Sequence, residues 1–389
     1  MDVKHWISSL FLWLLMLCCL EAKSTNLMGK PGEGYYIEVA IGSPPQVFNV
    51  LVDTGSTNFA IAAAPNPNIE TFFIASNSSS YVSLDKKVSV LYTQGFWDGE
   101  LGSDVMYFPS LSEPIVRCDI AAIHSSHNFY MNGSRWQGIL GLAYPVIARP
   151  DHSVLSWLEA LQRIKGTTPA SFALKLCGAE GEDDHTGVLQ ILDKPYETTK
   201  VFLTSPIIRE WFYELVLFDI NVGNESVDLP CQMLNTDKTI LDSGTTSLRL
   251  PTQVFLKVVK LLNSSINQLN VPMSEDFWLQ QKMLCWKDSL DWSKFPNVSL
   301  SLMHSDFSYF VLDFPPQSYI RKVTDNSEDE ELRNCYKFSI ESSNTGTVLG
   351  VVVMEGLNVV FNRSNKTVGF SKSDCGPDVD LRGPFLSKI

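Results

Sequence analysis

The sequence predicts an all-β protein made of two similar lobes with a few short helices. The chain has 389 residues, which is enough for about two domains, and 44% of them are hydrophobic and can fill substantial cores. Segments that alternate apolar and polar residues, as half-buried strands do, outnumber segments with helical spacing. The motif Leu51–Gly55, LVDTG, returns as Ile240–Gly244, ILDSG, with β-type segments around each copy. This internal repeat predicts two equivalent halves.

The first 22 residues are expected to be a signal peptide. Lys4 precedes an apolar run at 6–20, which is shorter than the roughly 20 residues that a membrane span needs. No later segment is apolar enough to span a bilayer. We therefore expect a protein of the secretory pathway, in the endosomal or Golgi lumen or outside the cell, with no membrane anchor in this chain.

Sequons and cysteines fit the same compartment. Cys18 and Cys19 lie in the signal peptide, and the other six cysteines are widely spaced, as in a large domain with a few disulfides. None has the C-x-x-C spacing of a zinc site, so we expect no metal, and no motif calls for another cofactor. The candidate N-glycosylation sites are Asn77, Asn132, Asn224, Asn263, Asn297, Asn362 and Asn365.

The formal net charge of −13 argues against two classes of partner. Nucleic acids and anionic membrane surfaces are both recognised by basic patches, which this composition does not favour. We expect no nucleic-acid partner.

Each half of the chain leads a β-type segment into an aspartate. In the first half, strands are expected at 35–42 and 47–52, joined by a turn, and the second runs into Asp53. In the second half, the alternating segment 211–222 precedes a strand at 239–241 that runs into the matching aspartate. The repeat therefore includes the strands that carry the two motifs.

The rest of the chain is expected to be mostly β. Helical spacing occurs only at 153–164 and 252–262. Further strands are expected at 88–91, 99–107, 115–123, 172–176, 298–302, 336–340 and 348–353. The expected domains are an N-terminal lobe at 30–190 and a C-terminal lobe at 205–375, followed by a C-terminal tail at 376–389.

Asp53 and Asp242 are the candidate catalytic residues. Two carboxylates delivered by equivalent loops can meet between the halves, and there they cannot both ionise, so the pair holds one proton over a range of acidic pH. The ionised partner can then take a proton from water, while the protonated partner hydrogen-bonds the carbonyl of a peptide bond. This predicts amide hydrolysis without a metal or a covalent intermediate.

The neighbours of the two aspartates suit this task and occupy matched positions: Thr54 and Ser243, Gly55 and Gly244, Ser56 and Thr245. The first pair has short hydroxyls that can hydrogen-bond across the aspartates. The glycines let backbone N–H groups approach the carboxylates, which a Cβ would obstruct. The last pair can each bond the outer oxygen of its own aspartate.

Two other interpretations of the motifs are open. A single D-T-G or D-S-G is a frequent turn, but two copies, each after apolar strand residues and before Ser or Thr, are much less expected by chance. A glycosidase also uses paired carboxylates, although its chemistry does not call for symmetry-related loops. Serine, cysteine and metalloprotease mechanisms lack their G-x-S-x-G, Cys/His and H-E-x-x-H motifs here.

The chain resembles the pepsin-like aspartic proteases over Tyr35–Cys375, and it is most similar to their beta-secretase (memapsin) branch. The similar segments are GYYIEVAIGSPPQ, LVDTGSTNFA, YTQGFWDGELG, WQGILGLAYPVIARP, LDSGTTSLRLP and TGTVLGVVVMEG. The resemblance implies a bilobal pepsin-like fold with a central cleft, the aspartate pair as catalytic dyad and endopeptidase activity on an extended peptide. Aspartic proteases are the standard example of two carboxylates that share a proton.

The resemblance also implies a flap and substrate-binding residues. Tyr92 would close over substrate, with Thr93 and Gln94 at the tip and Trp97 holding the Tyr92 hydroxyl. On the sequence alone, a tyrosine on a strand is more often a core residue. Thr246 and Arg249 would bind substrate, with Arg249 favouring polar or acidic side chains, and the alternative for Arg249 is a surface arginine.

Disulfides Cys177–Cys375 and Cys285–Cys335 are implied by the resemblance. The family partner of Cys231 would lie beyond Ile389, and Cys118 matches none of the family's bridges. The segment between the signal peptide and Gly34 is shorter than the family's inhibitory prosegment, and the chain stops before the membrane span that beta-secretases carry. Activation is therefore expected to differ or the N-terminus to be incomplete.

The expected function is that of a monomeric, beta-secretase-like endopeptidase. Its substrates would be proteins or peptides, in particular juxtamembrane segments of membrane glycoproteins. The alternative is a catalytically silent peptide-binding protein on the same fold, which commonly has lost an aspartate or altered its flap. Both aspartates and Tyr92 are present here.

Overall fold

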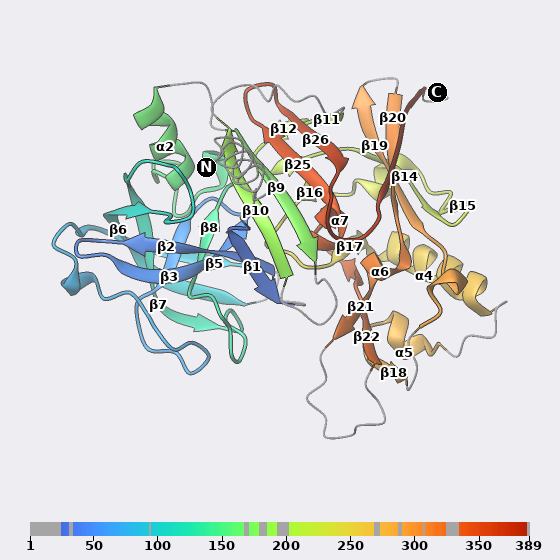
Figure 1. The fold of residues 1–389 in the computed structure, drawn as a ribbon, viewed down its shortest axis with the longest axis horizontal. Helices are drawn as coiled ribbons and strands as arrows, with labels where there is room; N and C mark the ends of the chain where they lie inside the picture. The colour runs from blue at the N-terminus through green and yellow to red at the C-terminus, as the bar shows by residue number, and fades with distance from the viewer. Residues whose placement is uncertain are drawn as a thin grey trace, which may run out of the picture.

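Figure 1 shows the arrangement of the chain in a computed structural model. The structure describes residues 25–30, 34–92, 95–166, 171–178, 185–192, 202–267, 273–286, 290–305, 308–323 and 334–386. Strands dominate these residues and the helices are few and short, so the prediction of an all-β protein is confirmed. The expected signal peptide lies outside the described residues.

The largest sheet has 13 strands and joins the two halves of the chain. Its order is β11-β26-β25-β9-β10-β1-β2-β3-β8-β4-β7-β6-β5. The bounds are β1 Leu27–Lys30, β2 Gly34–Ile41, β3 Gln46–Asp53, β4 Phe59–Ala62, β5 Val82–Leu91, β6 Phe96–Tyr107, β7 Val116–His127, β8 Gly138–Gly141, β9 Ser171–Gly178, β10 His185–Leu192, β11 Leu203–Pro206, β25 Leu357–Asn362 and β26 Thr367–Lys372. Strand β25, from the C-terminal half, pairs with β9 from the N-terminal half. In Figure 1 these two strands lie in the middle of the molecule.

Three smaller sheets belong to the C-terminal half. The six-stranded sheet holds β12 Arg209–Glu210, β13 Tyr213–Glu214, β16 Thr239–Leu241, β24 Thr347–Leu349, β17 Leu248–Pro251 and β23 Ile340–Ser343. The five-stranded sheet holds β15 Glu225–Ser226, β14 Leu217–Val222, β19 Val298–Ser305, β20 Ser308–Phe314 and β27 Asp380–Leu386. The three-stranded sheet holds β18 Leu284–Trp286, β22 Asn334–Phe338 and β21 Ile320–Val323.

Within the described residues two helices exceed two turns, α2 Trp157–Lys165 and α4 Thr252–Asn267, and both were expected from the sequence. Helix α2 begins after Ser156, whose side chain accepts a hydrogen bond from the Glu159 N–H, and ends at Gly166 with a positive φ of 62°. The shorter helices are α3 Cys231–Leu234, α5 Glu275–Trp278, α6 Pro316–Tyr319, α7 Val351–Met354, and the 3-10 turns Ala75–Asn77, Pro145–Ile147 and Trp292–Lys294.

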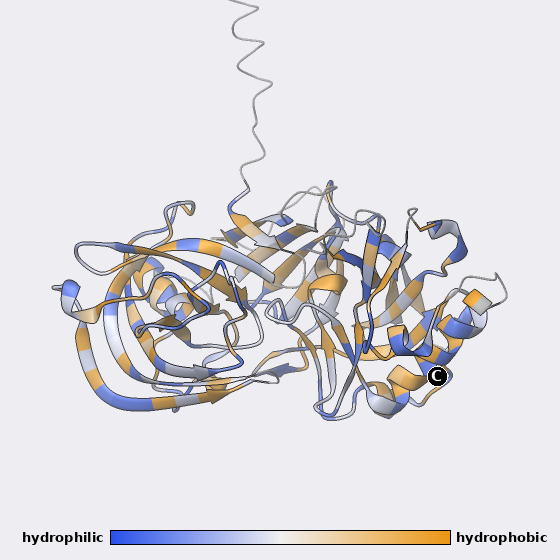
Figure 2. Cartoon of the chain, turned by 90° about the horizontal axis from the view of Figure 1, so that it is seen from below, coloured by the Kyte–Doolittle hydropathy of each residue, from blue (hydrophilic) through white to orange (hydrophobic). Residues whose placement is uncertain are grey.

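Strand alternation builds the cores. In β20 every second residue is buried, and along the strands in Figure 2 hydrophobic and hydrophilic residues alternate in the same way. The two strands next to the first motif are different, because β4 and β8 are buried throughout. These strands lie in the interior beneath the aspartate loop and hold it in place.

Two expected strands are wrong in detail. The segment 211–222 does not form one strand, because it breaks between β13 and β14, which join different sheets. The segment 348–353 leaves its sheet after Leu349 and turns into α7. The N–H groups of Val351 and Val352 donate to the carbonyls of Thr245 and Thr246 at 2.8 and 3.2 Å, so the backbone bonds the aspartate loop rather than a strand.

Most of the expected tail at 376–389 that the structure describes forms a strand, β27 at Asp380–Leu386. Strand β27 pairs antiparallel with β20, with Tyr309 opposite Phe385 and Val311 opposite Arg382. Leu386 at its end is 83% exposed. The chain therefore adds an edge strand to the five-stranded sheet.

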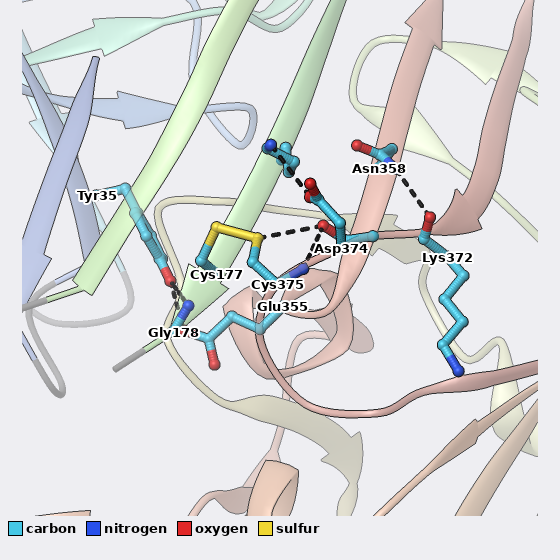
Figure 3. The surroundings of a disulfide bond; sticks show 10 residues. Tyr35, Cys177, Gly178, Glu355, Asn358, Lys372, Asp374 and Cys375 are labelled. Carbon is cyan, nitrogen blue, oxygen red and sulfur yellow. Dashed lines mark hydrogen bonds and ion pairs between the residues drawn. A yellow bond between two sulfur atoms is a disulfide. The ribbon is translucent and has the colours of Figure 1, made fainter. Parts of the chain in front are cut away.

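Two disulfides lie in the described residues, Cys177–Cys375 and Cys285–Cys335, the same pairs that the resemblance implies. The first joins the end of β9 to the segment after β26. Figure 3 shows Tyr35 and Glu355 beside it, with the Tyr35 hydroxyl at the Gly178 backbone. Cys118 and Cys231 are not disulfide-bonded.

Candidate active site

The two aspartates stand at the ends of equivalent strands. Asp53 ends β3, which pairs in parallel with β8, and Asp242 follows β16, which pairs in parallel with β24. The Asp53 carbonyl accepts from the Leu142 N–H at 2.8 Å, and the Asp242 N–H donates to the Leu349 carbonyl at 3.0 Å. The same strand pairing thus holds each loop.

The two loops meet, and each glycine packs against the opposite aspartate. A Cβ on Gly55 would lie 2.5 Å from Cγ of Asp242, and a Cβ on Gly244 would lie 2.3 Å from Oδ1 of Asp53. Both distances are far shorter than a carbon atom tolerates. Glycine is needed at these two positions so that each loop can approach the aspartate of the other loop. The sequence predicted a different reason, that glycine lets backbone N–H groups approach the carboxylates, and both reasons hold.

A reciprocal set of hydrogen bonds joins the loops directly behind the carboxylates. The Thr54 N–H donates to Oγ of Ser243 at 3.0 Å, and the Ser243 N–H donates to Oγ1 of Thr54 at 2.9 Å. Each hydroxyl in turn donates to a carbonyl of the other strand, Thr54 to Leu241 at 2.9 Å and Ser243 to Val52 at 2.7 Å. Both side chains are buried. The network fixes the separation of the two loops.

Each carboxylate receives matched hydrogen bonds from its own loop. Oδ1 of Asp53 accepts from the Gly55 N–H at 2.8 Å, and Oδ1 of Asp242 accepts from the Gly244 N–H at 2.8 Å. The outer oxygens accept from hydroxyls, Asp53 from Ser56 at 2.5 Å and Asp242 from Thr245 at 2.8 Å. These hydrogen bonds fix the orientation of each carboxylate and prevent it from rotating.

Burial and like charge favour a proton on Asp53. Asp53 is only 4% exposed, and this burial, together with the charge of Asp242, raises the pKa of Asp53 well above its usual range. The bonds from Ser56 and Gly55 act in the opposite direction and are weaker. Asp242 is half-buried, so solvent reaches one side of the pair. The pair can therefore hold a proton while remaining open to water.

The β5–β6 hairpin places Tyr92 near the aspartates. The indole N–H of Trp97 donates to the Tyr92 hydroxyl at 3.4 Å, and the Tyr92 ring stacks on Phe129 at a centroid distance of 5.6 Å. Burial and the charge of Asp53 raise the pKa of Tyr92. The Tyr92 hydroxyl therefore lies within electrostatic reach of the aspartate pair. Thr93 and Gln94 lie outside the described residues.

Arg249 and Thr246 lie beyond the Asp242 loop. Arg249 is in β17, opposite Glu341 of β23, and the two side chains form an ion pair with Nε 3.2 Å from the Glu341 carboxylate. Thr246 and Glu341 both line a small cavity of about 50 Å³. The ion pair neutralises Arg249, which sequence reasoning did not foresee because Glu341 is far away in the sequence.

A second buried cluster also escaped the sequence analysis. The Tyr35 hydroxyl donates to Oε1 of Glu355 at 2.7 Å, Arg321 forms two hydrogen bonds with the same carboxylate, and His185 lies 3.4 Å from it. Glu355 is 1% exposed. The four side chains come from distant segments, so no spacing along the chain could have indicated them.

The comparisons with known proteins identify the class of protein. The chain belongs to the eukaryotic aspartyl protease family, whose profile matches residues 34–373. It is 40% identical to a beta-secretase of Strongylocentrotus purpuratus over 378 residues, which are 92% of this chain and 69% of that protein. The resemblance that the sequence motifs indicated is confirmed, and the protein is an aspartic endopeptidase with a pepsin-like bilobal β fold.

More distant relatives cover similar shares of the chain. Identity is 26% over 351 residues to pepsin A of Gallus gallus, covering 87% of this chain and 83% of that protein. It is 25% over 346 residues to gastricsin of Mus musculus, covering 87% and 81%. Within the described residues, every helix is too short or too polar to cross a membrane.

Proposed function

We propose that Asp53 and Asp242 form the catalytic dyad and hydrolyse peptide bonds by activating water. The observation that carries this proposal is the reciprocal contact of the loops, in which each glycine leaves no room for a Cβ beside the opposite carboxylate. A pair of ordinary turns would not require this approach.

The division of roles follows from the environments of the two groups. Asp53 is the more buried, and its pKa is raised, so it carries the shared proton and donates it to the substrate carbonyl. Asp242 is half-buried and faces solvent, so it takes the proton from the attacking water. The hydrogen bonds from Gly244 and Thr245 fix the orientation of its carboxylate.

The substrate class follows from the relatives. We propose that the enzyme cleaves extended segments of proteins close to a membrane, the juxtamembrane parts of membrane glycoproteins, because it is similar to a beta-secretase over most of its length. The flap hairpin would cover such a strand with Tyr92. Thr246, beside the dyad loop, would contact it, and Arg249 would act through its ion pair with Glu341 rather than as a free cation.

The test is digestion of an unbiased peptide library by the secreted protein between pH 4 and 7. Asp53→Asn and Asp242→Asn should each abolish cleavage. The matched control is Asp237→Asn, an exposed aspartate with a positive φ of 64° that asparagine adopts readily, and it should keep full activity. A folded, disulfide-bonded protein that cleaves nothing would support the peptide-binding alternative instead.

A further inference from the structure

A groove on the outer face of the five-stranded sheet has no role in the proposed reaction. Its volume is about 580 Å³, within the roughly 300–1,000 Å³ of ligand pockets. The lining residues come from β14, β19, β20 and β27 and from the turn after β14, and none belongs to the aspartate loops. In Figure 1 these strands lie at the far side of the molecule from β2 and β3. We call it the outer groove.

Aromatic rings and polar groups alternate on its wall. The Tyr309 ring lies 5.6 Å from Phe385 and 6.3 Å from Phe218, so three strands contribute one continuous aromatic surface. Phe385 is 42% exposed. Asp219 and the half-exposed Arg382 also line the groove. Apolar ring faces beside hydrogen-bonding groups match a sugar, which has C–H faces and hydroxyl edges.

The rim of the groove carries a sequon. Asn224 lies at the turn between β14 and β15, is exposed, and is itself part of the groove lining. The sequon serine, Ser226, donates to Oδ1 of Asp219 at 2.8 Å. A sugar attached to Asn224 would therefore begin at the rim, next to the aromatic surface.

A nearby sequon has the opposite environment. Nδ2 of Asn297 donates to Asp313 at 3.0 Å, and the sequon serine Ser299 donates to the same carboxylate at 2.6 Å. Asn297 is half-buried and Ser299 only 4% exposed. A glycan on Asn297 would break this arrangement, whereas one on Asn224 would disturb no such bond.

We propose that Asn224 carries an N-linked glycan whose first sugars occupy the outer groove. Attachment forms a bond from Nδ2 to the anomeric carbon of the first N-acetylglucosamine. Nδ2 loses one proton, and the pyrophosphate of the lipid-linked oligosaccharide donor leaves. The chain's own glycan then covers the aromatic surface that the sheet exposes. This inference does not depend on the proposed peptidase mechanism.

The experiment uses the full chain secreted from a eukaryotic host. Mass spectrometry of glycopeptides should find Asn224 occupied and Asn297 unmodified. An endoglycosidase that cleaves between the first two N-acetylglucosamines should then trim the Asn224 glycan about tenfold more slowly on the native protein than on the isolated glycopeptide, because stacking protects these sugars. The exposed sequon at Asn132 is the control, and its glycan should show little difference between the two forms.

Two variants test whether the aromatic rings of the outer groove hold the glycan. Tyr309→Ser removes the central ring, and Phe385→Ser removes the outermost one, and each should abolish most of the protection at Asn224 without changing its occupancy. If either variant is not secreted, the trimming rates on the unmutated native protein and on the isolated glycopeptide still test the proposal. An unmodified Asn224 in the secreted protein, or equal trimming rates at Asn224 in the native protein and the glycopeptide, would overturn the proposal.

Discussion

At the scale of single residues, the aspartate pair depends on two glycines that lack a Cβ as much as on the side chains that bond each other. Gly55 and Gly244 allow the loops to meet, and Thr54 and Ser243 bind them together. The sequence predicted these residues because the two motifs are in register. It could not predict that each glycine contacts the opposite aspartate, since that depends on how the halves dock.

Gly244→Ala should inactivate the enzyme. The added Cβ would lie 2.3 Å from Oδ1 of Asp53 and would push the carboxylates apart, at a cost of about 1–3 kcal/mol in the free energy of unfolding. The measurement is peptide hydrolysis together with thermal unfolding. Gly133→Ala is the control, because its Cβ would meet nothing within 4 Å and only its positive φ of 74° is costly. It should lose stability but keep its activity per folded molecule.

Asp53→Asn should stabilise the fold increasingly as the pH rises. Burial and Asp242 raise the pKa of Asp53, so the folded chain holds a proton that the unfolded chain loses above about pH 4. The aspartate therefore costs stability as the pH rises above that value, whereas asparagine does not titrate. We expect a gain of about 1–3 kcal/mol at pH 7 and a smaller one at pH 4 by urea unfolding. An equal gain at both values would contradict the raised pKa.

At the scale of elements, the flap hairpin and α7 show what local pattern can and cannot predict. Strands β5 and β6 were expected, though shorter than they are. Helix α7 was missed because Val351–Val353 are β-branched and favour strands, and only the carbonyls of Thr245 and Thr246 draw this backbone away from the sheet. Tertiary hydrogen bonds determine whether such a segment forms a strand or a helix.

Tyr92→Phe should lower kcat/KM by about 2–10-fold, and Tyr92→Ala by more. The first change removes only the hydroxyl that accepts from Trp97, a hydrogen bond worth about 0.5–1.5 kcal/mol, and it keeps the ring stacked on Phe129. The second removes the stacking as well. Steady-state kinetics on one cleaved peptide would measure both. Full activity in Tyr92→Ala would show that this side chain does not close over the substrate.

At the scale of the whole molecule, the two halves share one large sheet and a buried ionic cluster. Strand β25 joins β9, and Glu355 connects Tyr35 of β2, His185 of β10 and Arg321 of β21. The sequence predicted two repeats but not their shared strands or the edge strand β27. Pairing between strands far apart in the chain leaves no local pattern.

Glu355→Gln should destabilise the protein by about 3–5 kcal/mol, because it leaves Arg321 without its buried partner. Burial alone would raise the pKa of Glu355, but Arg321, His185 and the Tyr35 hydrogen bond outweigh it and lower the pKa. The contribution is therefore present above about pH 4 and is lost as the pH falls through the lowered pKa.

Urea unfolding of both proteins between pH 3 and 7 measures this difference. Glu210→Gln is the control, because it removes the partner of Lys366 in an exposed pair and should cost less than about 1 kcal/mol. A loss for Glu355→Gln no larger than that of the control would show that the cluster contributes little to joining the halves.

The central claim is that Asp53 and Asp242 share one proton during catalysis. The most direct test is the pH dependence of kcat/KM for one cleaved peptide. We expect a bell-shaped profile, with a low-pH limb where the pair takes up a second proton and a high-pH limb, moved upward by the raised pKa of Asp53, where it loses the first. A profile with only one limb would contradict the shared proton.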